Sequence, residues 1–127
     1  MEKENKTVLL TGTIDSALYN NTGNKVKNIR ERYHMYTDSI EAYIKESVFD
    51  NIVFAENSQY DFPADRFFEM TKKYNKKFEY VKCLSYVEKT IKHGKSYGEA
   101  RIIEDALKMS SLLQESPTIY KITGRIF

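Results

Sequence analysis

The sequence of 127 residues contains no tryptophan, two prolines, five glycines and a single cysteine. One cysteine cannot form an internal disulfide or hold a zinc ion alone, which excludes disulfide scaffolds and zinc fingers. Cys83 lies within the apolar, strand-like residues 78–84, so we expect a buried thiol without a catalytic role. Such cysteine usage fits a reducing compartment.

Long apolar runs are also missing. None approaches the length of a membrane span, and the charged residues 1–6 precede an apolar run too short for a signal peptide. We therefore expect a cytoplasmic protein. The basic residues 72–77 leave two interpretations open: a solvated helix end whose dipole they complement, or a surface that meets lipid phosphate at the inner face of the membrane.

The chain has no excess of one charge. Twenty Lys and Arg against eighteen Asp and Glu leave a net charge of +2, and the two signs are interleaved. This pattern excludes a general nucleic-acid binder. The length suffices for one modest core but not for two, so residues 1–127 are expected to form a single domain.

Four short apolar runs predict β-strands. Residues 7–14 are almost continuously apolar or β-branched, which is typical of a central strand covered on both faces. The polar residues 15–24 then predict a loop at its carboxyl end. Further strands are expected at residues 51–55, 78–84 and 118–122.

Three helices are expected between these strands. Helical spacing of apolar residues predicts the first over residues 29–46, and Pro63 suits the start of a second that buries Phe67 and Tyr74. Ser96 and Glu99 have the spacing of a capping box and predict the start of a third helix. The order βαβαβαβ predicts a three-layer, Rossmann-like α/β fold with a mostly parallel sheet.

The fourth strand is expected to be central, although the chain ends at Phe127, only a few residues later. Globular domains seldom end directly after a central strand. We therefore expect either a chain that is truncated relative to its relatives or a sheet that another subunit completes.

Polar residues follow the first two strands, at the sheet edge where open α/β folds bind ligands. Thr11 and Thr13 suit contact with a base or ribose, and they equally suit an ordinary polar strand end. Glu56 is interpreted either as an acceptor for a sugar hydroxyl or base imino group, or as an exposed loop carboxylate. Neither Gly-x-Gly-x-x-Gly nor a P-loop occurs, which excludes phosphate binding of those two kinds.

Basic residues accompany the later elements. Gly94, Lys95, Gly98 and Arg101 surround the start of the third helix, where unpaired N–H groups and the dipole favour an anion such as diphosphate. The alternative is structural: Gly94 forms a turn, Gly98 allows close packing of the helix, and Lys95 and Arg101 are solvated. Arg125 can grip a phosphate with two parallel hydrogen bonds, and Lys121 precedes it in the fourth strand. The alternative is that both residues only lie on a terminal strand and have no ligand-binding role.

Taken together, these segments resemble the amino-terminal, nucleotide-sugar-binding half of bacterial surface-polysaccharide glycosyltransferases with a GT-A-type fold. Residues 8–14, 51–57, 94–100 and 120–125 carry the resemblance. It implies contacts with the nucleotide sugar at Thr11, Thr13, Glu56, Lys95 and Gly98.

In that family the fourth strand usually leads to an Asp-x-Asp motif that binds a divalent metal and the sugar diphosphate. Here Thr123-Gly124-Arg125 stands near that place. Two alternatives stay open: a divalent metal bound without that motif, or phosphate contact by the cationic Arg125 in place of the metal. The resemblance also implies that the acceptor-binding half and catalytic base lie beyond this chain, so no catalytic residue is assigned.

The expected function is therefore binding of a nucleotide-diphosphate sugar, for transfer to a polysaccharide or lipid-linked acceptor. The alternative is a non-catalytic α/β interaction subunit, which forms a homo-oligomer or joins a partner through an exposed edge strand.

Overall fold

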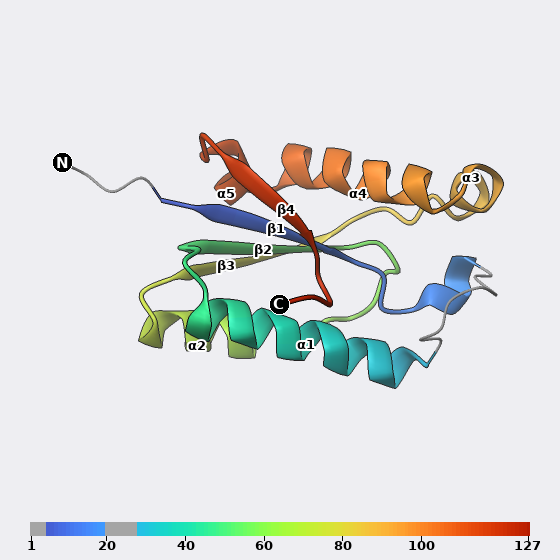
Figure 1. Ribbon diagram of the computed structural model, residues 1–127. Coiled ribbons are helices and arrows are strands. Elements are labelled where there is room, and N and C mark those ends of the chain that lie inside the picture. The colour runs from blue at the N-terminus through green and yellow to red at the C-terminus, as the bar shows by residue number, and fades with distance from the viewer. Residues whose placement is uncertain (1–4, 20–27) are drawn as a thin grey trace.

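A computed structural model describes residues 5–19 and 28–127. A four-stranded sheet in the order β3-β2-β1-β4 forms its middle layer, and all three strand pairs are parallel. The strands are β1 (Thr7–Gly12), β2 (Asn51–Glu56), β3 (Lys77–Lys82) and β4 (Ile119–Thr123). Helices cover both faces of the sheet (Figure 1), so the expected three-layer, Rossmann-like α/β class is confirmed.

The first strand is central, as its apolar run predicts. All residues of β1 are buried, and its Leu9 pairs with Val53 of β2 on one side and with Lys121 of β4 on the other. The central position expected for the fourth strand was wrong, because β4 lies at the edge of the sheet. Its composition suits an edge, since Tyr120 is 45% exposed and Lys121 is also exposed.

Two helices pack on one face of the sheet, α1 (Ile29–Glu46) and α2 (Asp65–Lys73). Asn28 caps α1 by accepting a hydrogen bond of 2.8 Å from the backbone N–H of Arg30. The core beneath these helices is aromatic, with Tyr36, Phe54 and Phe67 fully or almost fully buried. The second helix is shorter than expected, because it ends at Lys73 and leaves Tyr74 exposed.

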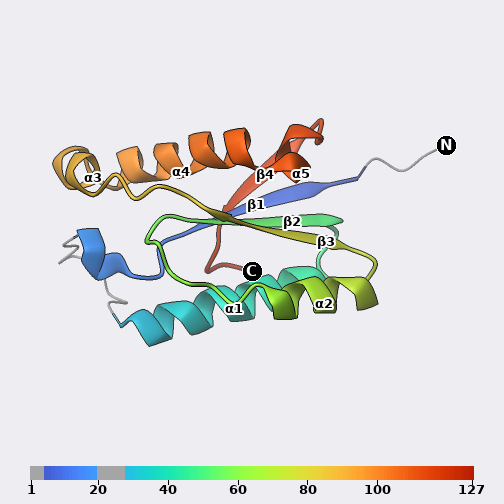
Figure 2. The ribbon, with the colours of Figure 1, turned by 180° about the vertical axis from the view of Figure 1, so that it is seen from behind.

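The other face carries three helices, α3 (Val87–His93), α4 (Lys95–Met109) and α5 (Ser111–Gln114), as the view from behind in Figure 2 also shows. Its core is mainly aliphatic and includes Leu9, Val53 and Ile102. The expected capping box was wrong: Gly94 is the N-cap of α4, and no side chain caps that helix end. Glu99 turns instead towards the sheet, as described below.

The loop predicted after the first strand contains a short 3-10 helix, η1 (Ser16–Tyr19), and its residues 20–24 lie outside the described part of the chain. The carboxyl ends of the strands, η1 and α3 all lie at one end of the molecule (Figure 1). The beginnings of α1 and α4 lie there too, so both helix layers contribute residues to that end.

The basic residues 72–77 divide into two groups. Lys72 and Lys73 are exposed in the last turn of α2, where their charges complement the helix dipole, and contact of these lysines with lipid phosphate stays a prediction. The ammonium group of Lys76 donates hydrogen bonds to the carbonyl oxygens of Tyr43 and Ser47, at 3.1 and 2.8 Å, and thereby satisfies the end of α1. Within residues 5–19 and 28–127, no helix combines the length and apolar character that a membrane span requires.

Candidate functional site

A pocket of about 360 Å³ opens at the carboxyl ends of β1 and β4. The chain leaves β1 towards the α1 face, whereas β4 is reached from the α4 face, so the two connections diverge at this point of the sheet. Ligands of open α/β folds bind at such a switch point. The lining comes from the strand ends and from both helix layers: Thr11, Gly12, Thr13, Ser16, Tyr19, Arg32, Tyr36, Asn57, Thr90, Ile91, Gly94, Lys95, Gly98, Glu99, Ile102, Thr123 and Arg125.

The amino end of α4 forms one wall. Gly94 has a φ of 94°, which suits glycine, and it leaves the first N–H groups of this 15-residue helix without a side-chain cap. Lys95 adds a positive charge beside them. One turn further, a Cβ on Gly98 would lie 3.0 Å from the Thr90 methyl group, so glycine allows α3 and α4 to pack closely. This wall attracts anions through its N–H groups, its dipole and Lys95.

The hydroxyl group of Thr90 lies on the same wall and has an unusual environment. Thr90 is 9% exposed, it lines the pocket, and its Oγ1 atom is buried without a hydrogen-bond partner among the described residues. Buried polar atoms nearly always have a partner, so an unpaired hydroxyl on a pocket wall is a position where a ligand or water can bind.

The side chain of Glu99 joins α4 to the floor of the pocket. Its Oε1 atom accepts a hydrogen bond of 2.8 Å from the Thr11 hydroxyl group and forms an ion pair with the Lys121 ammonium group. These contacts explain why Glu99 does not cap its own helix. They also place Lys121 on the α4 side of β4, next to the pocket although not in its lining.

The opposite wall is built around Arg32 of α1. This arginine is only 4% exposed, and its Nε and Nη2 atoms donate to the Thr13 carbonyl at 2.7 Å and to the Tyr36 hydroxyl at 3.3 Å. Burial lowers the pKa of the guanidinium, the neighbouring Tyr36 partly offsets this, and the positive charge of Arg125 lowers it further. An arginine remains protonated under these conditions, so Arg32 joins Lys95 and Arg125 as the third cation in the described pocket lining.

Arg125 is positioned by the turn that follows β4. The N–H of Gly124 donates to the Thr11 carbonyl at 2.7 Å, and a Cβ at this glycine would lie only 2.8 Å from the same oxygen. Glycine is therefore needed for the close approach. The Nε atom of Arg125 is buried and has no partner among the described residues, which leaves a donor for a ligand.

The acidic residue after β2 lies beneath the pocket and not in its wall. Glu56 is fully buried, which rules out the exposed loop carboxylate considered from the sequence. Its carboxylate accepts N–H bonds from Ile14 at 2.7 Å and Ser58 at 2.9 Å, and burial raises its pKa. Glu56 thus holds the loops after β1 and β2 together. The neighbouring Asn57 lines the pocket and accepts a hydrogen bond of 2.6 Å from the Thr13 hydroxyl group.

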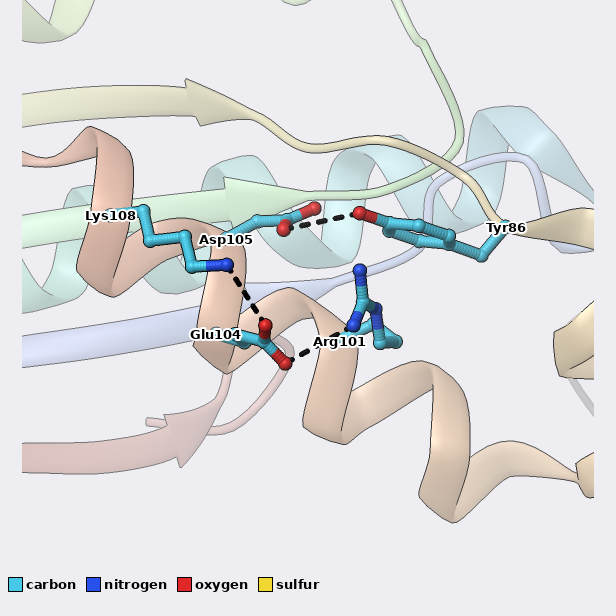
Figure 3. Close-up of polar contacts among 5 residues, drawn as sticks. All are labelled: Tyr86, Arg101, Glu104, Asp105 and Lys108. Carbon is cyan, nitrogen blue, oxygen red and sulfur yellow. Dashed lines mark hydrogen bonds and ion pairs between the residues drawn. The ribbon is translucent and has the colours of Figure 1, made fainter.

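A polar cluster on the far side of α4 supports the α3 wall (Figure 3). The Arg101 guanidinium lies 4.1 Å from the centre of the Tyr86 ring, and the Tyr86 hydroxyl group donates to Asp105 at 3.3 Å. Glu104 pairs with Arg101 at 3.2 Å and with Lys108 at 3.0 Å. The cluster ties the loop between β3 and α3 to α4, and none of its members lines the pocket.

The structure brings together most of the residues that the sequence analysis selected. Five of them line the pocket: Thr11, Thr13, Lys95, Gly98 and Arg125. Sequence reasoning missed Arg32, Thr90 and Glu99. A signal existed for Arg32, because it lies four residues before Tyr36 and hence on the buried stripe of α1. No signal in the sequence pointed to Thr90, because α3, the helix that carries it, was not expected.

The residues at the end of β4 do not fit a divalent metal, because Thr123, Gly124 and Arg125 provide a guanidinium where carboxylates would be needed. Across the described ranges, no three His, Cys, Asp or Glu side chains are grouped so as to hold a metal ion. Cys83 is buried as expected, and its burial, followed by the negative charges of Asp105 and Glu56, raises the pKa of the thiol to about 12.

Comparison with known proteins gave no match: no family model, curated protein or solved structure is significantly similar to this chain.

Proposed function

We propose that this pocket binds the diphosphate and nucleoside of a nucleotide sugar, and that the chain is the donor-binding module of a glycosyltransferase in surface-polysaccharide synthesis. The observation that carries the proposal is the convergence of Arg32, Lys95, Arg125 and the amino end of α4 on one pocket at the switch point of a parallel sheet.

The phosphates belong between Lys95 and Arg125 in this proposal. The uncapped N–H groups of α4 and the unpaired Nε of Arg125 are donors that suit phosphate oxygens, and Arg32 adds positive charge behind them. The nucleoside then lies along Thr11, Thr13 and Asn57, whose polar groups suit a base or ribose. A pocket of about 360 Å³ is within the usual size range for small-molecule sites.

This arrangement also suits the chemistry of sugar transfer. When the bond between the sugar and the diphosphate breaks, negative charge grows on the leaving diphosphate. Fixed cations such as Arg125 and Lys95 stabilise that charge without reorganising, which is the role a metal has in related chemistry. We assign no catalytic base. The cytoplasmic location expected from the sequence is part of this proposal, as is a polysaccharide or lipid-linked acceptor.

Isothermal titration calorimetry with uridine- and guanosine-diphosphate sugars tests the proposal. The titrations are run once with EDTA and once with Mg²⁺. Binding that persists in EDTA supports a diphosphate site made of protein cations. If neither this chain nor a longer version binds any nucleotide sugar under either condition, the proposal is wrong.

A second candidate function is a non-catalytic subunit that assembles through β4. The observation in its favour is the open edge of the sheet at β4, where Tyr120 is 45% exposed. Light scattering over a range of concentrations tests this function. A dimer that Tyr120→Lys disrupts would favour it, whereas a monomer at high concentration would count against it.

A further inference from the structure

We infer that Glu99 is the specificity-determining residue of the pocket and that it recognises hydroxyl groups of the ligand, on the ribose or on the transferred sugar. The inference rests on the proposed function, since it concerns the same pocket. It adds a recognition role for a carboxylate in a site whose other charged lining residues, among those described, are cations.

The two carboxylate oxygens of Glu99 have different surroundings. Oε1 is taken by the Thr11 hydroxyl group and the Lys121 ammonium group. Oε2 accepts no hydrogen bond from the part of the chain that the structure describes, and the side chain is 35% exposed on the pocket wall. Thr11 and Lys121 therefore fix the carboxylate in place and leave one oxygen available to a donor in the pocket.

The charge of the Glu99–Lys121 pair determines which ligand group can donate a hydrogen bond to Oε2. A free carboxylate beside a phosphate site repels the phosphate, but here Lys121 neutralises Glu99 by direct ion pairing. The remaining acceptor suits a neutral donor, and a hydroxyl group is the donor that a nucleotide sugar carries next to its phosphates. Hydrogen bonds to a charged acceptor are about twice as strong as those between neutral groups, so Glu99 discriminates well between ligands with and without the hydroxyl.

The helix sets the spacing between the two contacts. Lys95 and Glu99 are four residues apart on α4, so they lie on the same face about 6 Å apart along the axis. A ligand that places phosphate at the amino end of α4 therefore brings the group next to the phosphate towards Glu99. An inorganic phosphate or pyrophosphate has no such group and reaches only the first contact.

Calorimetric titration of the Glu99→Gln variant with four probes tests the inference: pyrophosphate, uridine diphosphate, its 2′,3′-dideoxy form and uridine-diphosphate glucose. We expect the substitution to lower the affinity for ligands that carry the recognised hydroxyl group about tenfold or more. Pyrophosphate binding should stay the same or tighten, because a negative charge has been removed. If the substitution weakens binding of uridine diphosphate but not of its dideoxy form, Glu99 recognises the ribose hydroxyl groups. If it weakens binding of uridine-diphosphate glucose alone, Glu99 recognises a hydroxyl group of the sugar.

Glu69→Gln is the matched control, because Glu69 is exposed on α2, outside the pocket, and should leave all four affinities unchanged. Glu99→Asp, which shortens the carboxylate, provides a second test should the glutamine variant fold poorly, and the same selective loss is expected. Equal affinities of wild type and variant, or an equal loss for all probes including pyrophosphate, would overturn the role of Glu99 alone. If the wild type binds none of the four probes, the proposed function fails and the inference with it.

Discussion

The hydroxyl group of Tyr36 accepts a hydrogen bond of 2.9 Å from the backbone N–H of Thr13, and this bond joins α1 to the end of β1. The same oxygen accepts a bond of 3.3 Å from Arg32. The Tyr36 ring also packs against Gly12 and Gly124, at which a Cβ would lie 2.5 and 3.1 Å from ring carbons. One buried tyrosine thus contacts the ends of both strands that form the pocket floor.

We predict that Tyr36→Phe destabilises the fold by about 1–3 kcal/mol, because the partly buried N–H of Thr13 loses its acceptor. Urea denaturation measures the change. Tyr74→Phe is the matched control, since Tyr74 is 41% exposed and should change stability little. Equal stability of the Tyr36→Phe variant and the wild type would show that water replaces the lost acceptor without cost.

A second prediction concerns Gly124→Ala. The new methyl group would lie 2.8 Å from the Thr11 carbonyl oxygen, and backbone atoms cannot move aside as a flexible side chain can. We expect a loss of about 1–3 kcal/mol in unfolding free energy. Weaker pyrophosphate binding is expected too, because Arg125 is displaced with the turn. Thermal unfolding and calorimetry measure the two effects, with the exposed Thr118→Ala as control. Unchanged values for both would contradict the close approach seen here.

Arg125→Ala separates the two candidate functions. If the pocket binds a diphosphate, removal of this guanidinium should weaken pyrophosphate binding about tenfold to a hundredfold, and Arg125→Lys should restore part of it. If the chain is an assembly subunit, the substitution should have little effect on any ligand. Arg66→Ala on α2 controls for the loss of one positive charge far from the pocket. The salt dependence of the affinity should also decrease in the Arg125→Ala variant.

The buried Glu56 should make stability depend on pH. Burial raises its pKa above the unfolded value, so the folded chain binds this proton more tightly than the unfolded chain does. The contribution of Glu56 to unfolding free energy therefore falls as the pH rises from the ordinary glutamate pKa to the raised one, and it stays constant above that.

Urea denaturation at several pH values, for wild type and Glu56→Gln, measures this contribution. The difference between the two curves should decrease with pH over that window, because glutamine does not titrate. The half-buried Glu41 and the exposed Glu104 have pKa values that hydrogen bonds from Lys45 and Lys108 lower. They give the opposite slope in both proteins, so their effect cancels in the difference. A flat difference curve would show that the hydrogen bonds from Ile14 and Ser58 offset the effect of burial on the Glu56 pKa, and a rising curve would show that they outweigh it.

The layers of this fold are predictable from the sequence, because a buried strand or helix face requires a recognisable pattern of apolar residues in the local sequence. The continuous apolar run of β1 and the helical spacing of α1 each depend on neighbouring residues only. The order of the strands in the sheet is not encoded in any such local pattern. The edge position of β4 follows from the path of the chain across the sheet through α4 and α5, which periodicity does not record.

The site was predictable where it depends on strand ends, and less so where it depends on tertiary contacts. Thr11 and Arg125 follow or end strands and were selected for that reason. Glu99 has the spacing of a helix cap, but the hydroxyl of Thr11 and the charge of Lys121 attract it more strongly than its own helix end does. Glu56 was expected at a ligand, yet it is buried against the loop after β1.

Thr11 and Thr123 are paired in the sheet although they come from opposite ends of the chain. No early folding unit made of β1, α1 and β2 can therefore contain the pocket, which exists only after the last strand has docked. A bound ligand would stabilise only the fold in which β4 is docked. The measured affinity would therefore depend both on the contacts in the pocket and on the fraction of molecules with β4 in place. In a newly synthesised chain, this pocket can therefore recognise its ligand only after β4 has paired with β1.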